Sequence, residues 1–293
     1  MIRITREIKF WRMIKRFFRH IKYDINSDID GPDLLRERLY VRGKDINDLI
    51  GDFSFTEAIF HILMNRRPDE VERKIFDAVL VSFHGGFGYS PPTVLLARLS
   101  ATTGTTIPHA LSAGYAGGGK YHVGAIENAM AMYEDIKESR TGGMPLKEDV
   151  EKYIDAVFEN KKTLYGFGHP LFKKDPRPEK LRGYVAELGY RSEYLDIYDA
   201  AAEIAADKKR LLPNIDGVNS AILLSLGFSK DYGTGLFLLS RTAAMLAHIV
   251  EEMQKTPFYT EDKLYPLIRT LERERSDGEG NSEDKFLAGK EMR

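Results

Sequence analysis

Apolar residues recur along most of the chain at spacings of three and four, which is the pattern of helices that bury one face. Phe55, Ile59 and Ile62, for example, fall on one side of such a helix. This spacing predicts helices over 53–63, 71–82, 93–101, 125–136, 150–160, 179–188, 194–206, 218–226 and 236–253. Strict apolar–polar alternation is nearly absent, and 39–42 is a short strand candidate. The pattern predicts an all-α protein in which the almost wholly apolar stretch 221–226 is deeply buried.

The two ends of the chain differ from this helical middle. Residues 1–22 carry eight basic residues against one acidic residue, and their apolar residues have helical spacing, so an amphipathic helix is expected. We expect its apolar stripe to pack on the body or on a partner subunit, with binding to a membrane surface or to nucleic acid as the alternative. Residues 271–293 are charged and poor in aromatic residues, which predicts a disordered tail. The expected organisation is an N-terminal arm over 1–30, a helical domain over 31–270 and the tail over 271–293.

Composition excludes several classes of protein and site. The net charge of −1 over 293 residues carries no global signal for binding to nucleic acid or membrane. The absence of cysteine excludes disulfides, thiol nucleophiles and cysteine-ligated metals, and it fits a cytoplasmic protein. No apolar run approaches the roughly 20 residues of a membrane span, and no apolar signal core stands near residue 1. We therefore expect neither a transmembrane segment nor secretion.

The glycine-bracketed turn Gly166-Phe-Gly-His169 is a candidate for acid–base chemistry. His169 is followed within eight residues by Lys173, Lys174 and Arg177, and three prolines stiffen the segment. A titratable side chain on a shaped loop beside concentrated positive charge suits proton transfer on an anionic substrate.

Two further histidines lie beside glycines. His84 precedes two glycines at the end of a helix, which suits either close approach of a ligand or a helix C-cap. His122 lies at the start of a helix, where free N–H groups and the helix dipole favour an anion and keep a histidine neutral; simple packing is the alternative. The preceding segment resembles a nucleotide-binding P-loop up to Lys120. Tyr121 stands where serine or threonine is needed and no strand precedes it, so we reject that function.

Asp216 and Arg241 are the remaining candidates. Asp216 leads into an apolar helix, either as its N-cap or as a base with a raised pKa. Arg241 lies inside an apolar helix, where a buried guanidinium needs an anionic partner from the protein or from a substrate carboxylate.

The other histidines carry weaker signals, and no metal site is predicted. His20 belongs to the basic arm, His61 and His248 are expected to be structural, and His109 is a less clear case near a helix start. The candidate histidines show neither H-x-x-x-H spacing nor nearby carboxylates, which argues against a shared metal ion.

These motifs together resemble the citrate synthase superfamily from about Arg42 to about Met253. The resemblance rests on Gly166-Phe-Gly-His169 with Asp175-Pro-Arg177, His84 with its glycines, His122 before Gly-Ala-Ile-Glu, Asn214-Ile-Asp216, Ser240-Arg241 and Ala247-His248. Three details are similar to the short citryl-CoA lyase branch, which includes the C-terminal module of ATP-citrate lyase. They are the His-Gly and Pro-Pro pattern after His84, Gly217 after Asp216, and a chain shorter than a typical synthase.

The resemblance implies a citrate synthase-like fold with a large and a small helical domain, the small one over about 147–230. It implies cleavage of citryl-CoA to acetyl-CoA and oxaloacetate. In that reaction His169 would take the hydroxyl proton, His122 would hold the enolate, and Asp216 would protonate its carbon.

Substrate binding and partners follow from the same resemblance. It implies that His84, Arg177 and Arg241 hold substrate carboxylates and that Lys173 and Lys174 meet coenzyme A phosphates. No metal or redox cofactor is implied beyond coenzyme A as part of the substrate. A homodimer is expected, and a separate subunit that forms citryl-CoA is a candidate partner.

One departure from the family pattern affects the choice of substrate. Family members commonly place an arginine just after the helix that ends near Met253, whereas here none follows until Arg269. A 2-methylcitrate-type or other 3-hydroxyacyl-CoA substrate therefore stays open, and so does a non-catalytic binding protein that retains the fold. The synthase direction also stays open, because synthase and lyase use one site in opposite directions.

Overall fold

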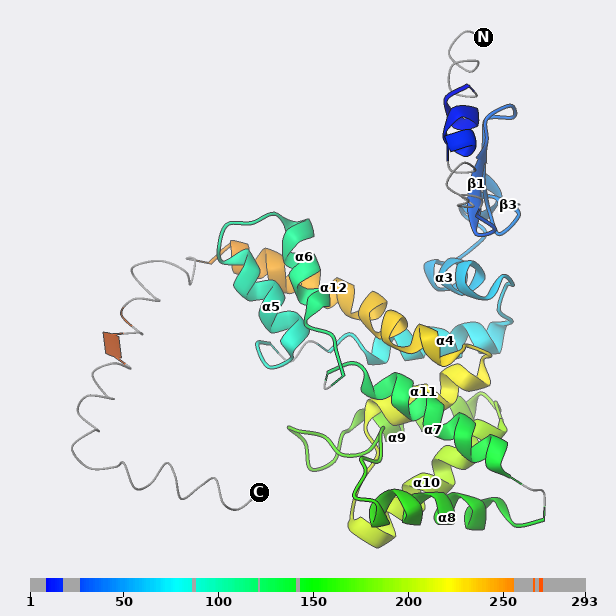
Figure 1. Cartoon of the computed structure of the whole chain (residues 1–293), viewed down its shortest axis with the longest axis vertical. Helices are drawn as coiled ribbons and strands as arrows, with labels where there is room; N and C mark the ends of the chain where they lie inside the picture. The colour runs from blue at the N-terminus through cyan, green and yellow to red at the C-terminus, as the bar shows by residue number, and fades with distance from the viewer. Residues whose placement is uncertain are drawn as a thin grey trace. The chain divides into compact units, whose positions relative to one another are not determined.

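The computed structural model describes residues 9–17, 27–85, 88–120, 122–140, 143–255, 266 and 269–270, and within them the fold is mainly helical (Figure 1). The predicted all-α class is confirmed. The helices are α2 Ile46–Leu49, α3 Phe55–Met64, α4 Glu70–Ser82, α5 Pro92–Ala101, α6 Ile107–Ala116, α7 Ala125–Ser139, α8 Leu146–Glu159, α9 Arg177–Glu187, α10 Glu193–Lys209, α11 Ile215–Ser225, the 3-10 turn η1 Lys230–Tyr232, and α12 Gly233–Met253. Residues 9–17 are also helical.

The chain divides into two compact units. The first unit comprises 1–82 and 129–230, and the second comprises 83–128 and 231–293. The stretch 147–230 that was expected to form the small domain lies inside the first unit. The domain limits themselves stay predictions, and the predicted tail over 271–293 lies outside the described residues.

A small antiparallel sheet stands in the first unit, in the order β1 Asp30–Asp33, β2 Arg38–Val41 and β3 Lys44–Asp45. Val41 pairs with Lys44 across a two-residue loop whose Arg42 and Gly43 both have positive φ, of 46° and 77°. Such a loop matches the right-handed twist of a hairpin. The strand predicted at 39–42 is thus confirmed within one residue, whereas β1 and β3 were not predicted.

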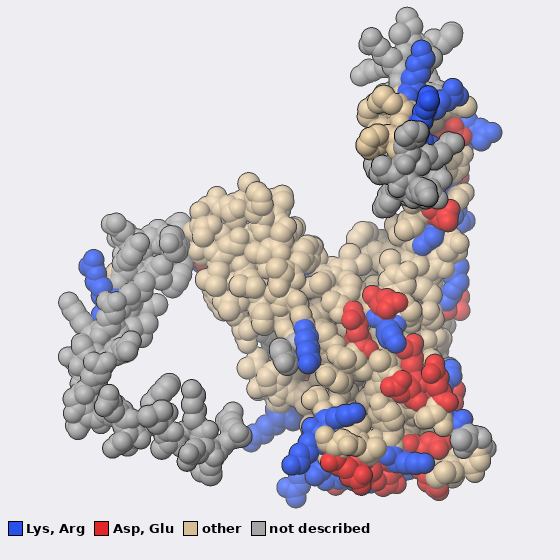
Figure 2. All heavy atoms as spheres, in the orientation of Figure 1, with Lys and Arg blue, Asp and Glu red and all other residues tan. Residues whose placement is uncertain are grey.

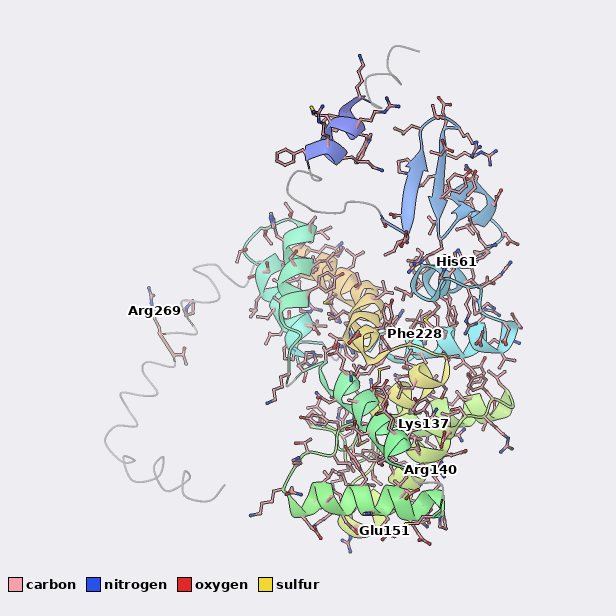
Figure 3. The ribbon with its side chains drawn as sticks, turned by 45° about the vertical axis from the view of Figure 1, so that its right-hand side comes forward. His61, Lys137, Arg140, Glu151, Phe228 and Arg269 are labelled. Atoms are coloured by element: carbon pink, nitrogen blue, oxygen red, sulfur yellow. The ribbon has the colours of Figure 1, made fainter. Side chains whose placement is uncertain are left out.

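The core of the first unit is built around three aromatic rings from α3, α4 and the segment after α11. The centroids of Phe60, Phe76 and Phe228 lie 5.2 to 5.4 Å apart, and all three side chains are buried. Figure 3 labels Phe228 at this place, with His61 of α3 nearby. Helix α11 is buried along almost its whole length, as the apolar stretch 221–226 predicted.

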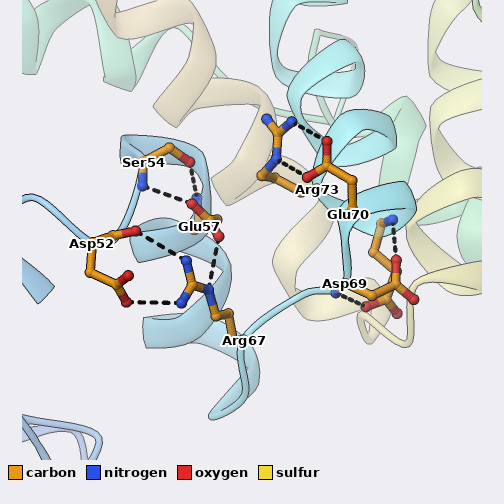
Figure 4. Close-up of polar contacts among 8 residues, drawn as sticks. Asp52, Ser54, Glu57, Arg67, Asp69, Glu70 and Arg73 are labelled. Carbon is orange, nitrogen blue, oxygen red and sulfur yellow. Dashed lines mark hydrogen bonds and ion pairs between the residues drawn. The ribbon is translucent and has the colours of Figure 1, made fainter.

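Polar side chains fix the start of α3. Ser54 Oγ accepts a hydrogen bond from Glu57 N at 3.2 Å, and Ser54 N donates to the Glu57 carboxylate at 2.8 Å, which forms a capping box. Arg67 joins this box by donating to Glu57 at 2.9 Å and to Asp52 at 2.8 Å (Figure 4). The chain therefore enters the helix at a defined residue.

In the second unit, α5, α6 and α12 pack together, and small residues allow the approach. A Cβ added at Gly114 of α6 would lie 2.8 Å from Met245 Sδ on α12 and 3.0 Å from the Thr93 carbonyl oxygen on α5. The buried Arg98 of α5 donates to Glu252 of α12 at 2.6 Å, and Tyr89 donates to the same carboxylate at 2.5 Å. A buried ion pair thus joins α5 to α12.

The helical stretch Lys230–Met253 is long and apolar enough, by length and composition alone, to cross a membrane. The apolar pattern of the sequence predicts no stretch of that length, so the structure differs from that prediction here. The stretch places Arg241 and Glu252 in buried positions, and both make hydrogen bonds within the second unit. That arrangement is the one expected of a core helix.

Candidate functional site

Two loops of the first unit are joined by backbone hydrogen bonds. Gly168 N donates to the Leu212 carbonyl at 2.7 Å, and Asn214 N donates to the Gly166 carbonyl at 2.9 Å. The Asn214 side-chain amide adds a bond to the Gly168 carbonyl at 2.6 Å. Loop 166–169 therefore lies directly beside the segment that leads into α11, and the parts of the chain that carry His169 and Asp216 are brought together.

Two glycines make this close approach possible. A Cβ added at Gly217 would lie 2.4 Å from the Gly166 carbonyl oxygen, and one at Gly166 would lie 2.5 Å from Gly217 Cα. Gly166 also has a φ of +83°, a conformation that other residues rarely adopt. Neither Gly166 nor Gly217 can therefore carry a side chain while the two backbones stay this close.

His169 is held by its own loop. Its Nδ1 accepts hydrogen bonds from Leu171 N and Phe172 N, both at 3.1 Å. With Nδ1 as an acceptor, the neutral ring carries its proton on Nε2. Burial lowers the pKa of His169; Asp175 opposes this effect and Arg177 adds to it. The neutral ring with an Nε2–H donor is the favoured form.

Asp175 and Arg177 form a two-pronged ion pair beside this loop. The Arg177 Nε donates to Asp175 Oδ1 at 2.9 Å, and its Nη2 donates to Oδ2 at 2.8 Å. Oδ2 also accepts from Ile215 N, the first residue of α11, at 3.0 Å. Arg177, predicted to hold a substrate carboxylate, is thus oriented by a protein carboxylate.

Asp216 is the second residue of α11 and is half-buried. Asn214 is the N-cap, because its side chain accepts hydrogen bonds from Asp216 N at 3.0 Å and from Gly217 N at 3.3 Å. Of the two interpretations of Asp216, the N-cap is wrong. Its carboxylate lies in the first turn of α11, where the helix dipole stabilises negative charge.

In the second unit, His122 stands in a tight turn before α7. Its backbone pairs with Gly119 in both directions, at 2.7 and 3.0 Å. Its Nε2 lies 3.2 Å from the hydroxyl of Thr93, which is fully buried at the start of α5. Burial lowers the pKa of His122, and the positive charge of Arg241 adds to this. The ring is therefore kept neutral, as the sequence predicted from the helix start.

The residue after His122 has an unusual backbone. Val123 is buried and has a φ of +74°, which is rarely adopted by a β-branched residue. Strain of this kind costs of the order of 1–3 kcal/mol and is held in place by surrounding structure. The turn that presents His122 is thus rigidly determined.

Arg241 is buried on α12, as the sequence predicted. Its Nε donates to the Phe83 carbonyl at 2.7 Å, and its guanidinium lies 4.7 Å from the centre of the Phe237 ring. The same ring meets the edge of His122 at a centroid distance of 6.3 Å. Phe237 therefore links the two candidate residues of this unit.

The other predicted site residues are more exposed. His84 lies two residues after α4 and is exposed. Lys173 and Lys174 are also exposed, and Lys174 pairs with Glu179 at 2.6 Å. The structure thus groups His169, Arg177 and Asp216 in the first unit and His122 and Arg241 in the second.

Three histidines that were given no role in the reaction have local contacts in the described part of the chain. His61 is buried on α3 with its ring 5.6 Å from that of Phe53. His248 makes a hydrogen bond to Arg98, and His109 lies 3.0 Å from the Thr106 hydroxyl. Within the described part of the chain, no group of three or more histidine, aspartate or glutamate residues is placed to hold a metal ion.

Three residues of the site were given no role from the sequence. Thr93 contacts His122, Asp175 orients Arg177, and Asn214 caps α11. The role of Asn214 could have been predicted, because asparagine is a preferred N-cap residue and Asn214 directly precedes the apolar helix. The roles of all these residues in a reaction stay predictions.

Comparison with known proteins shows which family the chain resembles. The family model described as "Citrate synthase, C-terminal domain" matches residues 59–270. A citrate synthase from Deinococcus radiodurans is 29% identical over 230 residues, which cover 76% of this chain and 59% of that enzyme. This chain therefore spans about three fifths of the length of that curated relative.

Solved structures extend the comparison. Citryl-CoA lyase from Hydrogenobacter thermophilus superposes with a TM-score of 0.73 at 31% identity, covering 81% of this chain and 91% of the lyase. ATP citrate lyase from Methanosaeta concilii has a TM-score of 0.67 at 19% identity, covers 80% of this chain and 40% of that one, and shows the fold alone. The match over 59–270 contains every candidate residue from His84 to Arg241.

Proposed function

Because the chain belongs to the citrate synthase family, we propose that it cleaves citryl-CoA to acetyl-CoA and oxaloacetate. We choose the lyase reaction because the chain is similar to the Hydrogenobacter citryl-CoA lyase and covers 91% of it. It covers only 59% of the Deinococcus citrate synthase. Condensation of the same acyl-CoA and keto acid is the alternative, because both directions use one transition state.

His169 acts on the oxygen that changes between hydroxyl and ketone. Its Nδ1 is occupied by two backbone N–H groups, so Nε2–H faces the substrate as a donor. The ring therefore donates a hydrogen bond to this oxygen and gives it a proton in the condensation direction. In the cleavage direction the hydroxyl proton leaves as the ketone forms, and His169 Nε2 takes it once the ring has moved its own proton to Nδ1 and given up both backbone hydrogen bonds.

His122 and Asp216 act on the acetyl group. When the carbon–carbon bond of citryl-CoA breaks, its electrons pass to the thioester and form an enolate. His122 is kept neutral, because burial and Arg241 lower its pKa, and as a neutral ring it can donate a hydrogen bond to the enolate oxygen. Asp216 supplies the proton that the enolate carbon needs to become the methyl group of acetyl-CoA.

Positively charged and hydrogen-bonding side chains hold the substrate. His84, Arg177 and Arg241 bind its carboxylates, with Asp175 fixing the orientation of Arg177. Lys173 and Lys174 are exposed and bind the phosphates of coenzyme A. No metal or redox group takes part in the proposed chemistry. Arg269, labelled in Figure 3, is exposed and is the first arginine that follows Met253 in the sequence.

The enzyme is proposed to be a cytoplasmic homodimer. Support for the dimer comes from α12, where Leu239, Leu246, Val250 and Met253 are apolar and 37–41% exposed. A separate subunit that forms citryl-CoA is proposed as the source of the substrate.

The proposed function is tested by assaying purified protein in both directions. Citryl-CoA alone, and acetyl-CoA with oxaloacetate, should each be converted. His169→Ala and Asp216→Ala should lower kcat by about a hundredfold or more, since each removes a proton donor or acceptor.

Matched controls for these two variants are His109→Ala and Asp207→Ala, which change side chains outside the motifs. They should keep the activity of the original chain. A folded protein without turnover in either direction would instead support the non-catalytic binding protein, and full activity of the His169 or Asp216 variant would refute the mechanism.

A further inference from the structure

Residues 9–17 form a helix that lies outside the family match over 59–270. We call it the arm helix; it is drawn in deep blue in Figure 1. Nothing in the proposed chemistry uses it. Its function is therefore a separate question from catalysis.

The arm helix separates charge from apolar surface around its axis. At 100° per residue, Phe10, Met13, Ile14 and Phe17 fall within one sector of 100°, and Lys9, Arg12 and Arg16 fall within a sector of 60° that begins 40° from Met13. No acidic residue occurs between Lys9 and Lys22. This combination of a cationic face with an aromatic-rich apolar face is typical of helices that lie in the plane of a membrane surface.

The body does not cover the apolar face. Phe10, Met13 and Phe17 are 52%, 60% and 63% exposed. Trp11 and Lys15 line a hollow with residues of the β1 hairpin, among them Asp30 and Pro32, which accounts for the lower exposure of Trp11. The expected packing of the apolar stripe on the body is thus not what the exposed fractions show.

We propose that the arm helix binds the surface of an anionic phospholipid bilayer. Phosphate headgroups would meet the basic side, and the acyl boundary would receive the exposed aromatic and methionine side chains. A duplex or single-stranded nucleic acid would satisfy the charges but would leave Phe10, Met13 and Phe17 in water. The bilayer is the partner that satisfies both faces at once.

The sequence supplies its own probe, because Trp11 is the single tryptophan of the chain. Its emission should shift to shorter wavelength when the full chain meets vesicles of phosphatidylcholine with phosphatidylglycerol. Vesicles of phosphatidylcholine alone should produce little shift, and added salt should weaken binding because it screens exposed charges.

Two sets of variants test the two faces. Replacing Lys9, Arg12 and Arg16 by glutamine should weaken partitioning by about a hundredfold at low salt. Replacing Phe10, Met13 and Phe17 by serine should abolish it, since charge alone holds a helix weakly. Matched controls remove three exposed cations and three exposed apolar side chains elsewhere: Lys152, Lys161 and Lys162 to glutamine, and Leu35, Ile50 and Phe55 to serine.

The control variants should bind vesicles as the original chain does. The proposal is overturned if anionic vesicles leave Trp11 emission unchanged, or if neutral vesicles shift it equally. It is also overturned if Trp11 emission shifts with protein concentration in the absence of lipid, which would indicate self-association. A shift that occurs with added RNA and not with vesicles would overturn it as well. Turnover of citryl-CoA is measured separately, so failure of either proposal leaves the other standing.

Discussion

Asp175 lies buried between the loop that carries His169 and the first turn of α11. Burial alone would raise its pKa, but hydrogen bonds from Arg177 and from Ile215 N outweigh this and lower it. A carboxyl group with a lowered folded pKa stabilises the protein above its unfolded pKa of about 3.9. That stabilisation is lost as the pH falls through the lower folded value.

Asp175→Asn should therefore destabilise the chain by about 3 kcal/mol at pH 7, because it leaves the Arg177 guanidinium without its charge partner. Asp199→Asn is a matched control, since Asp199 also pairs with an arginine, Arg182, but is 46% exposed. The control should cost less than about 1 kcal/mol. Urea unfolding measures the free energy of unfolding of both variants. Equal losses would show that the buried Asp175–Arg177 pair stabilises the chain no more than the exposed Asp199–Arg182 pair does.

Residue type and local context were sufficient to select His122, His169 and Asp216 as candidates, and their roles stay predictions. His122 and His169 stand in glycine-rich loops, Asp216 stands in the first turn of α11, and each carries a side chain that can move a proton. Nothing in the sequence indicates Thr93, because a threonine at a helix start is common. Its contact with His122, 29 residues away, exists only once α5 is packed.

At the scale of elements, the contact of loop 166–169 with α11 determines how the first unit presents its candidate residues. The carbonyl of Gly166 and the backbone of Gly217 meet at a distance that leaves no space for a side chain. This contact, rather than the length of α11, decides where Asp216 stands relative to the loop. It is therefore the element-level feature most sensitive to substitution.

Gly217→Ala should force loop 166–169 away from α11 and destabilise the chain by roughly 1–3 kcal/mol, as overpacking of a filled site does. It should also lower kcat, because the loop carries His169. Gly183→Ala, in the middle of α9, is the control: nothing lies within 4 Å of its added Cβ. That change should stabilise the chain by up to about 1 kcal/mol. If thermal unfolding gives both variants the same midpoint, the close contact is not a constraint.

Helices with regular apolar spacing could be predicted to within a few residues, because that spacing is a local property of the chain. The predicted set lacks α6, whose buried residues are only Ala110 and Gly114. Small residues carry little apolar signal, yet they let α6 approach its neighbours. β1, with the sequence Asp-Gly-Pro-Asp, contains poor strand formers and is paired only by the hairpin that follows.

At the scale of the whole molecule, charge is distributed unevenly. Figure 2 shows basic and acidic side chains gathered over α8 and α10, while the face over α5 and α6 is free of them. α12 adds Leu246 and Val250, which are 40% and 37% exposed. We propose this uncharged, partly apolar surface as the contact between two copies of the chain.

Leu246→Glu with Val250→Glu should convert the proposed dimer to a monomer, because each charge would be buried in an apolar contact. Light scattering coupled to size exclusion measures the mass. Leu35→Glu with Ile50→Glu introduces the same charges at other exposed apolar positions and should leave the dimer intact. A monomeric original chain, or a double variant that stays dimeric, would exclude α12 from the interface.

Synthesis on the ribosome separates the two parts of the second unit in time. α5 and α6 belong to the part 83–128, and α12 belongs to 231–293, so the stretch 129–230 must be made between them. At about 5–20 residues per second, roughly 100 residues take about 5–20 s. Throughout that interval, the apolar faces of α5 and α6 that α12 later covers stay open to other nascent chains. We therefore expect slower translation through 129–230 to lengthen the exposure of these faces and to raise the fraction of this protein that aggregates before it folds.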